Sequence, residues 1–206
     1  KNPALVAYND KHNIVEVLDF FENQPSGQHF KYHDNGKKSY IAFYKAGKKN
    51  GLEEFFAEDG VLLGQGFYRD DLPVGRHWRN HPNGQQEYIA EFDEEGNLKQ
   101  PITEYDEKGQ KKKFLYQEKG RLCGVYQEWY PSGQLRVDYF YQQGELEGLQ
   151  REFYESGQQK IQAFYHEGDK QKVYEEWHEN GQLAKEVNWL DDLREGLSRE
   201  WFIGGQ

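Results

Sequence analysis

The sequence predicts an all-β fold, an elongated and twisted antiparallel sheet built of β-hairpin repeats of about 24 residues. The first observation is a glycine that recurs in short turn sequences such as SGQ and NGQ, at intervals of 24 residues with a single interval of 25. The second is that every interval holds two segments rich in β-branched and aromatic residues, too short for helices. The recurring glycines are Gly36, Gly60, Gly84, Gly109, Gly133, Gly157, Gly181 and Gly205.

The glycine spacing also predicts the domain organisation. Counting each repeat from nine residues before its turn glycine, seven full repeats and part of an eighth occupy residues 27–206 as one continuous repeat domain. A single hairpin cannot bury its aromatic side chains, whereas hairpins stacked side by side can. Residues 1–26 contain Tyr8 and a strand-like segment but no turn glycine near position 12, so we expect a degenerate N-terminal capping unit there.

Each repeat is predicted to contain two strands joined by a tight turn. In the repeat that starts at Gly124, the first strand reads VYQEWY and the second reads LRVDYFY. Between them, Pro131-Ser132-Gly133 is typical of a type I turn closed by a left-handed glycine, which makes a hairpin with a bulge. A second turn, such as QQGELEG, then joins one hairpin to the next.

Alternation along the strands predicts which side chains are buried. One face of the second strand is rich in aromatic, β-branched and alanine residues, and we expect this face to form the core. Aromatic residues at the sixth position of the repeats are also expected in the core, with a carbohydrate or peptide groove as the alternative. The predicted buried face includes Tyr40, Ala42, Tyr44, Tyr88, Ala90, Phe92, Val137, Tyr139, Tyr141, Ile161, Ala163 and Tyr165, and the sixth-position aromatic residues include Trp129, Phe153, Trp177 and Trp201.

The charge of the chain narrows the classes of partner. With 26 Lys and Arg against 36 Asp and Glu, the formal net charge is -10. A net anion is repelled by nucleic acid and by anionic membranes, so neither is an expected partner. The charge favours a basic protein partner, or else it keeps a sheet-rich surface soluble. The single cysteine, Cys123, is interpreted as structural, and no run of apolar residues is long enough for a transmembrane helix.

A row of glutamates forms the candidate interaction site. One glutamate precedes the sixth-position aromatic residue in five repeats, and alternation puts these glutamates on the face opposite Trp129 and its equivalents. The row is either a solvated ladder balanced by Arg151, Lys185 and Arg199, or an acidic stripe that docks a basic partner. The row comprises Glu104, Glu128, Glu152, Glu176 and Glu200, and the candidate partner-binding residues are Glu128, Tyr130, Glu152, Tyr154, Glu176, His178 and Glu200.

The same spacing argues against catalysis and metal binding. Metal ligands lie within about 2 Å of one ion. Equivalent residues in neighbouring repeats lie two strands apart, roughly 9–10 Å, so repeated histidines such as His33 and His81 cannot share an ion. The glutamates are identical copies at the same spacing and lack the differentiated environments of a catalytic pair. We therefore predict no enzyme activity, no metal and no cofactor.

These repeats resemble a known family. The pattern Gly-x4-aromatic-x2-[Asn/Asp/Ser]-Gly-x7-aromatic-x2-Gly-x3-Gly is similar to the MORN repeat in its bacterial variant form, with clear copies in GVYQEWYPSGQLRVDYFYQQGELE and GLQREFYESGQQKIQAFYHEGDKQ. The resemblance covers about residues 27–206 and implies a MORN-like solenoid. The chain lacks the extra strand glycines of the eukaryotic form, which often associates with lipids, so we expect no direct membrane binding by the repeats.

The resemblance also implies a function in binding. Similar bacterial proteins are antitoxins, or immunity proteins, which suggests a cytoplasmic protein that neutralises a basic toxin domain. Others are exported, so the alternative is a scaffold or adhesion protein of the periplasm or cell envelope. The chain does not begin with Met, which is consistent with a removed signal peptide. The oligomeric state stays open, because the end hairpins leave sheet edges available for pairing.

Overall fold

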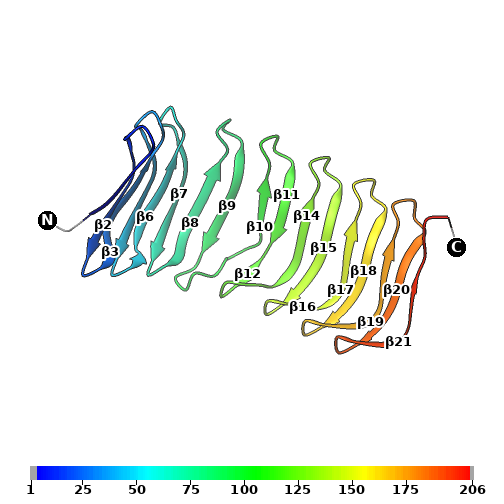
Figure 1. Ribbon diagram of the computed structural model, residues 1–206. Coiled ribbons are helices and arrows are strands. Elements are labelled where there is room, and N and C mark those ends of the chain that lie inside the picture. The colour runs from blue at the N-terminus through cyan, green and yellow to red at the C-terminus, as the bar shows by residue number, and fades with distance from the viewer. Residues whose placement is uncertain (1–3, 205–206) are drawn as a thin grey trace. The chain divides into compact units, whose positions relative to one another are not determined.

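A computed structural model describes residues 4–204, which group into two compact units. Unit 1 contains the chain up to residue 100 together with 107–109, and unit 2 contains residues 101–106 and the chain from 110 onward. All strand pairs are antiparallel and the described residues form no helix, so the predicted all-β hairpin fold is confirmed. Figure 1 shows the hairpins of each unit following one another in sequence order. The predicted turn glycine Gly205 lies outside the described residues.

Unit 1 contains a nine-stranded sheet in which neighbouring strands follow the chain order. The short β5 extends the pairing of β4 beyond its main partner β6. The strands are β1 (Ala4–Tyr8), β2 (Ile14–Phe21), β3 (Gln24–Tyr32), β4 (Lys38–Lys45), β5 (Lys48–Lys49), β6 (Gly51–Phe56), β7 (Leu62–Arg69), β8 (Leu72–Asn80) and β9 (Gln86–Phe92).

Unit 2 contains a ten-stranded sheet of the same kind and a two-stranded ribbon formed by β12 and β13. Its strands are β10 (Ile102–Tyr105), β11 (Lys111–Leu115), β12 (Gln117–Glu118), β13 (Arg121–Leu122), β14 (Gly124–Trp129), β15 (Leu135–Gln142), β16 (Glu145–Leu146), β17 (Gly148–Phe153), β18 (Gln159–His166), β19 (Asp169–Trp177), β20 (Leu183–Leu190) and β21 (Leu193–Glu200).

The strands therefore pair within two large sheets, where the sequence predicted one continuous repeat domain. The break between β9 and β10 falls in the single 25-residue interval. There the chain makes a turn in which the Asp93 side chain accepts hydrogen bonds from the backbone N–H groups of Glu95 and Asn97. Leu98 follows as a buried residue bridged to Phe92. The extra residue thus occurs where regular strand pairing stops.

The hairpin turns have the predicted geometry. The Gly133 N–H donates to the carbonyl of Tyr130 at 2.8 Å, and the Tyr130 N–H donates to the carbonyl of Gln134 at 2.8 Å. Gly133 has a φ of 85°, the left-handed conformation that glycine adopts without steric cost. The strand register shifts between Glu128 and Trp129, so the predicted bulge is also confirmed.

The N-terminal segment predicted as a degenerate cap is also a hairpin. Strands β1 and β2 pair through a turn at residues 9–13. His12 stands 24 residues before Gly36 and adopts a φ of 62°, so it occupies the place of the turn glycine. The sequence pattern missed this hairpin because a histidine replaces the glycine that marks the turn elsewhere.

Cross-strand pairing defines two faces, because residues directly opposite one another point to the same side. We call the face that carries Tyr126, Tyr139, Tyr141, Tyr165 and Tyr174 of unit 2, with its equivalent in unit 1, the tyrosine face. It holds most of the buried residues, as predicted for the second strands. The buried residues of this face are Ala42, Ala90, Leu115, Val137, Ala163 and Val187, with the polar His29, Glu53, His77 and Gln150.

The sixth-position aromatic residues occupy the opposite face. Trp129 follows Glu128, and Glu128 pairs with the buried Val137, so the indole projects away from the buried face. Trp129, Phe153 and Trp177 are only partly buried. The expectation that these aromatic residues share one core with the second-strand residues is therefore wrong.

Every buried polar residue of the described chain lies at the third position of a repeat. His29, Glu53, His77 and Gln150 are spaced by whole repeats, and each is at most 8% exposed. Gln150 accepts a hydrogen bond from the Phe140 N–H at 2.8 Å and donates to the Phe140 carbonyl at 3.2 Å. The residue opposite is small, Ala163 in this case, which leaves room for the polar side chain. Gln150 and His77 bind backbone groups beside register shifts. His29 and Glu53 instead contact side chains of neighbouring strands.

Candidate protein-binding face

The acidic row Glu128, Glu152, Glu176 and Glu200 lies on the tyrosine face of unit 2. Glu152 pairs with Val137 on one side and with Ile161 on the other, and Ile161 in turn pairs with Glu176. The row is on the face opposite Trp129, as predicted. That face is nevertheless the more buried one. Glu128, Glu152 and Glu176 are partly buried, whereas Glu200 at the end of the sheet is exposed.

Glu128 and Glu200, the first and last of these four glutamates, are neutralised by basic residues. The Arg136 guanidinium forms an ion pair with Glu128, and the Lys185 ammonium lies 2.7 Å from the Glu200 carboxylate. Lys185 was expected to balance the row and does. Arg151 and Arg199 were expected to do the same, but they lie on the opposite face because they pair across the strands with Asp138 and Glu186. Their ion pairs measure 2.5 and 2.9 Å.

The two central glutamates have no basic partner among the ion pairs of residues 4–204. The hydroxyl of Tyr139 donates to Oε1 of Glu152, and the hydroxyl of Tyr174 donates to Oε2 of Glu176 over 3.2 Å. Burial, then the Glu176 and Glu152 charges, raise the pKa of Tyr174 to about 12. Burial and the hydrogen bond to Glu152 raise the pKa of Tyr139. Both phenols therefore stay neutral and remain donors to the carboxylates at neutral pH.

The other three candidate residues connect neighbouring hairpins. The Tyr130 hydroxyl donates to the carbonyl of Phe153 at 2.9 Å, and the Tyr154 hydroxyl donates to that of Trp177 at 2.8 Å. His178 Nε2 lies 2.9 Å from the Trp201 carbonyl oxygen. Each side chain thus binds the backbone of the next repeat. The sequence placed these residues beside the acidic row but did not reveal this role.

Tyr130 and Tyr154 are close enough to the acidic row for its charge to raise the pKa of their hydroxyls. The pKa of Tyr130 is raised by burial first and then by neighbouring carboxylates that include Glu152. The pKa of Tyr154 is raised by burial and then by Glu176. The structure therefore places Tyr130 near Glu152 and Tyr154 near Glu176.

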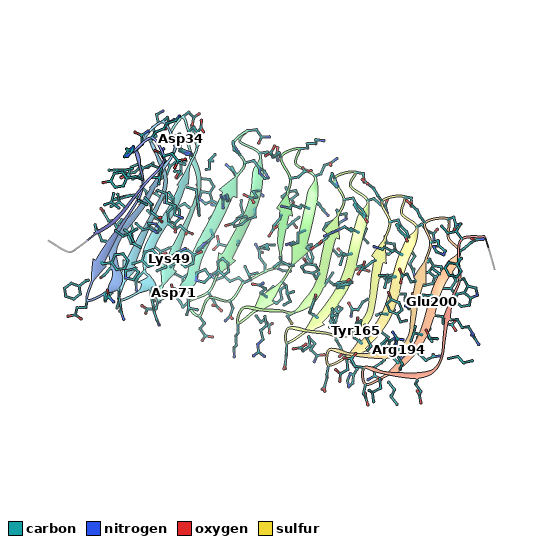
Figure 2. All side chains as sticks on the ribbon, in the orientation of Figure 1. Asp34, Lys49, Asp71, Tyr165, Arg194 and Glu200 are labelled. Atoms are coloured by element: carbon teal, nitrogen blue, oxygen red, sulfur yellow. The ribbon has the colours of Figure 1, made fainter. Side chains whose placement is uncertain are left out.

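A small cavity opens beside Glu152. Its volume is about 100 Å³, and Tyr165, which is labelled in Figure 2, contributes to its wall. The position of the cavity between neighbouring hairpins was not foreseen, because it depends on cross-strand neighbours far apart in sequence. The lining residues are Tyr139, Leu146, Gln150, Glu152, Ile161, Ala163, Tyr165, Lys170 and Tyr174.

Over residues 4–204, no group of three or more His, Cys, Asp or Glu side chains is arranged to hold a metal ion. No helix suited to crossing a membrane occurs in the described part of the chain. Cys123 is a partly buried free thiol.

Comparison with protein families agrees with the repeat geometry. A family model described as the MORN repeat variant matches residues 25–46, 49–70, 122–143, 146–167 and 170–191, which is more than half of the chain. The chain belongs to the MORN repeat variant family. Each MORN variant match spans the turn of one hairpin and the two strands that the turn joins, except for the first residue of β3 and of β19. No curated protein matches the chain.

The longest stretch without a MORN variant match, residues 71–121, departs from the repeat pattern in three places. It contains Asn80 in place of a sixth-position aromatic residue, Gln100 in place of a starting glycine, and the 25-residue interval. It still folds into hairpins, since β8 pairs with β9 and β10 pairs with β11. MORN repeats are generally non-enzymatic binding modules, so the chain is a repeat protein of the binding type.

Proposed function

We propose that this MORN variant protein binds a basic protein partner without catalysis, and that it acts as an antitoxin or immunity protein that neutralises a toxin. The observation that carries the proposal is the pair Glu152 and Glu176. Both carboxylates are partly buried on the tyrosine face and take part in no ion pair among the described residues. The net charge of -10 adds long-range attraction for a basic surface.

The energetics of a buried carboxylate support a cationic partner. A partly buried charge without an opposite charge loses part of its hydration and gains only hydrogen bonds in return. A lysine or arginine from a partner would supply the missing charge in a site that is shielded from water. Such charge-assisted hydrogen bonds are roughly twice as strong as neutral ones. Complex formation therefore removes an electrostatic cost that the free protein carries.

The seven candidate residues would contribute unequally. Glu152 and Glu176 are expected to dominate, since their charges are not already compensated. Glu128 and Glu200 would contribute less because a partner must compete with Arg136 and with a lysine. Tyr130, Tyr154 and His178 present ring surface beside the row while their polar atoms stay bound to the next hairpin.

The test is protection from a toxin encoded by an adjacent gene. Co-expression of the MORN variant protein with that gene product should restore growth, and the two purified proteins should elute together in size-exclusion chromatography. Growth arrest that persists with both proteins soluble would contradict the antitoxin role. Export of the chain with a lipid anchor would instead favour an envelope scaffold or adhesion protein.

Charge reversal then tests the surface. The variant E152K/E176K should lose co-elution and protection, whereas E118K/E195K should retain both. The control changes the net charge by the same amount at two exposed glutamates outside the acidic row. Equal loss in both variants would indicate that only net charge matters and would contradict the assignment of the tyrosine face.

A further inference from the structure

The cavity beside Glu152 has the composition of a receptor for one cationic side chain. One carboxylate, Glu152, stands among the phenol rings of Tyr139, Tyr165 and Tyr174 and the apolar side chain of Ile161. Its Oε1 is occupied by the Tyr139 hydroxyl, and no ion pair of the described residues involves either oxygen. We infer that this cavity binds a single lysine or arginine side chain of the partner protein, an inference that rests on the proposed function.

Unit 1 contains a related arrangement with a cation in place, in which the carboxylate stands at the third position of its repeat and not at the fifth, as Glu152 does. The Lys49 ammonium, labelled in Figure 2, lies 2.5 Å from Oε1 of Glu53 and 4.4 Å from the centre of the Tyr68 ring. The Tyr40 hydroxyl donates to the same carboxylate at 2.7 Å. On this face of a MORN variant hairpin, a carboxylate, a tyrosine hydroxyl and a tyrosine ring therefore hold an ammonium group.

The repeat that contains Glu152 lacks this internal cation. Leu146 stands where Lys49 stands in the repeat of Glu53, both two residues before the starting glycine. The strand pairing agrees, since Leu146 pairs with Tyr141 as Lys49 pairs with Tyr44. In this repeat Leu146 replaces Lys49 and Gln150 replaces Glu53, while the carboxylate stands two residues further along the same face, at Glu152.

Lys170 also borders the cavity but is held elsewhere. Its ammonium lies 4.9 Å from the centre of the Trp189 ring and 5.9 Å from that of Tyr174, and it forms no ion pair with Glu152. Cation–π contact with these rings favours that position. The Glu152 carboxylate is therefore left for a cation from outside the chain.

Size and chemistry limit the ligand. A volume of about 100 Å³ holds the end of one long side chain and excludes a folded element. The methylene groups of lysine or arginine can lie against Ile161 and Ala163, while the charged end reaches Glu152. A neutral side chain of similar length would leave the carboxylate uncompensated, so the site distinguishes charge as well as shape.

The test uses a tetralysine peptide and a tetra-acetyl-lysine peptide as probes. The purified full chain carries 13C-labelled methyl groups, and NMR signals of Ile161 and Ala163 report binding at near-physiological salt. We expect saturable shifts of both signals with tetralysine and none with the acetylated peptide. In the E152Q variant, which keeps an acceptor for Tyr139, binding should be on the order of tenfold weaker. The control E118Q should bind as the wild type does.

A gain-of-lysine variant provides an independent check. In L146K the new ammonium should reach Glu152, because both residues line the cavity, and tetralysine should no longer shift the Ile161 signal. Unshifted Ile161 and Ala163 signals in the wild type, or equal affinities of E152Q and E118Q, would overturn the inference. Peptide binding at Glu152 without protection from the toxin would contradict the proposed function alone. Protection that survives E152Q would contradict this inference alone.

Discussion

The hydroxyl of Tyr139 donates a hydrogen bond to the carboxylate of Glu152, across the boundary between two hairpins of unit 2. Tyr139 belongs to the second strand of one repeat and Glu152 to the first strand of the next. This hydrogen bond therefore links two neighbouring repeats and also holds Glu152, the central residue of the candidate binding face.

Removing that hydroxyl should affect stability and binding together. In Y139F the Glu152 carboxylate loses its donor while staying partly buried, and we expect a loss of about 1–3 kcal/mol in the free energy of unfolding. Urea denaturation followed by tryptophan fluorescence measures the loss. The same change at an exposed tyrosine, Y8F, serves as the control. Equal unfolding midpoints for Y139F, Y8F and the wild type would show that the contact is not formed in solution.

The contact of Tyr154 with the next hairpin should be replaceable by histidine. Y154F loses the hydrogen bond to the Trp177 carbonyl and should be destabilised by about 0.5–1.5 kcal/mol. Y154H should recover most of that loss, because His33 and His178 occupy the same repeat position and bind the equivalent carbonyls. Thermal unfolding compares the three proteins, and a Y154H variant no more stable than Y154F would contradict this equivalence.

Alkaline stability should depend on Glu176. Burial and the Glu176 charge raise the pKa of Tyr174 to about 12, above the ordinary value near 10. A folded-state pKa that is raised means stability is fully present below pH 10 and is lost as the pH rises from 10 through 12. In E176Q the raising charge is gone, so phenolate absorbance should develop at lower pH than in the wild type. The control E118Q removes an exposed charge, and identical titration curves for both variants would refute the assignment.

Replacing His12 with glycine should stabilise the N-terminal hairpin. His12 adopts a φ of 62°, and left-handed backbone disfavours residues with a Cβ by roughly 1–2 kcal/mol. We therefore expect H12G to stabilise the N-terminal hairpin, detected as slower amide hydrogen exchange in β1 and β2. The opposite substitution G36H, at the equivalent position of the next hairpin, should destabilise. Faster exchange in H12G would contradict the equivalence of the two turns.

The sequence predicted the hairpins because glycine spacing and strand alternation are local signals. Gly133 and the alternate residues Val137 and Tyr139 are where the pattern puts them. The N-terminal hairpin was not predicted, because His12 adopts a left-handed backbone conformation that is not expected for a histidine. Cross-strand pairing partners were harder to predict than the hairpins. Arg151, for example, lies on the face opposite the acidic row because it pairs with Asp138.

The candidate site was predicted only in part. The acidic row could be recognised from repeat spacing, and its nearness to Tyr130 and Tyr154 follows from adjacency in the chain. Which glutamates lack an ion pair could not be recognised, because Arg136 and Lys185 reach Glu128 and Glu200 across strands. The buried role of Gln150 also depends on such a neighbour, the backbone of Phe140.

The affinity of the proposed partner toxin for E152Q/E176Q, compared with its affinity for E118Q/E195Q, tests the central claim most directly. Both variants remove two negative charges and keep the shape of the side chains. Calorimetric titration at two salt concentrations should show the E152Q/E176Q variant binding at least about tenfold more weakly, with the control close to the wild type. Equal affinities of the two variants would contradict recognition through the tyrosine face.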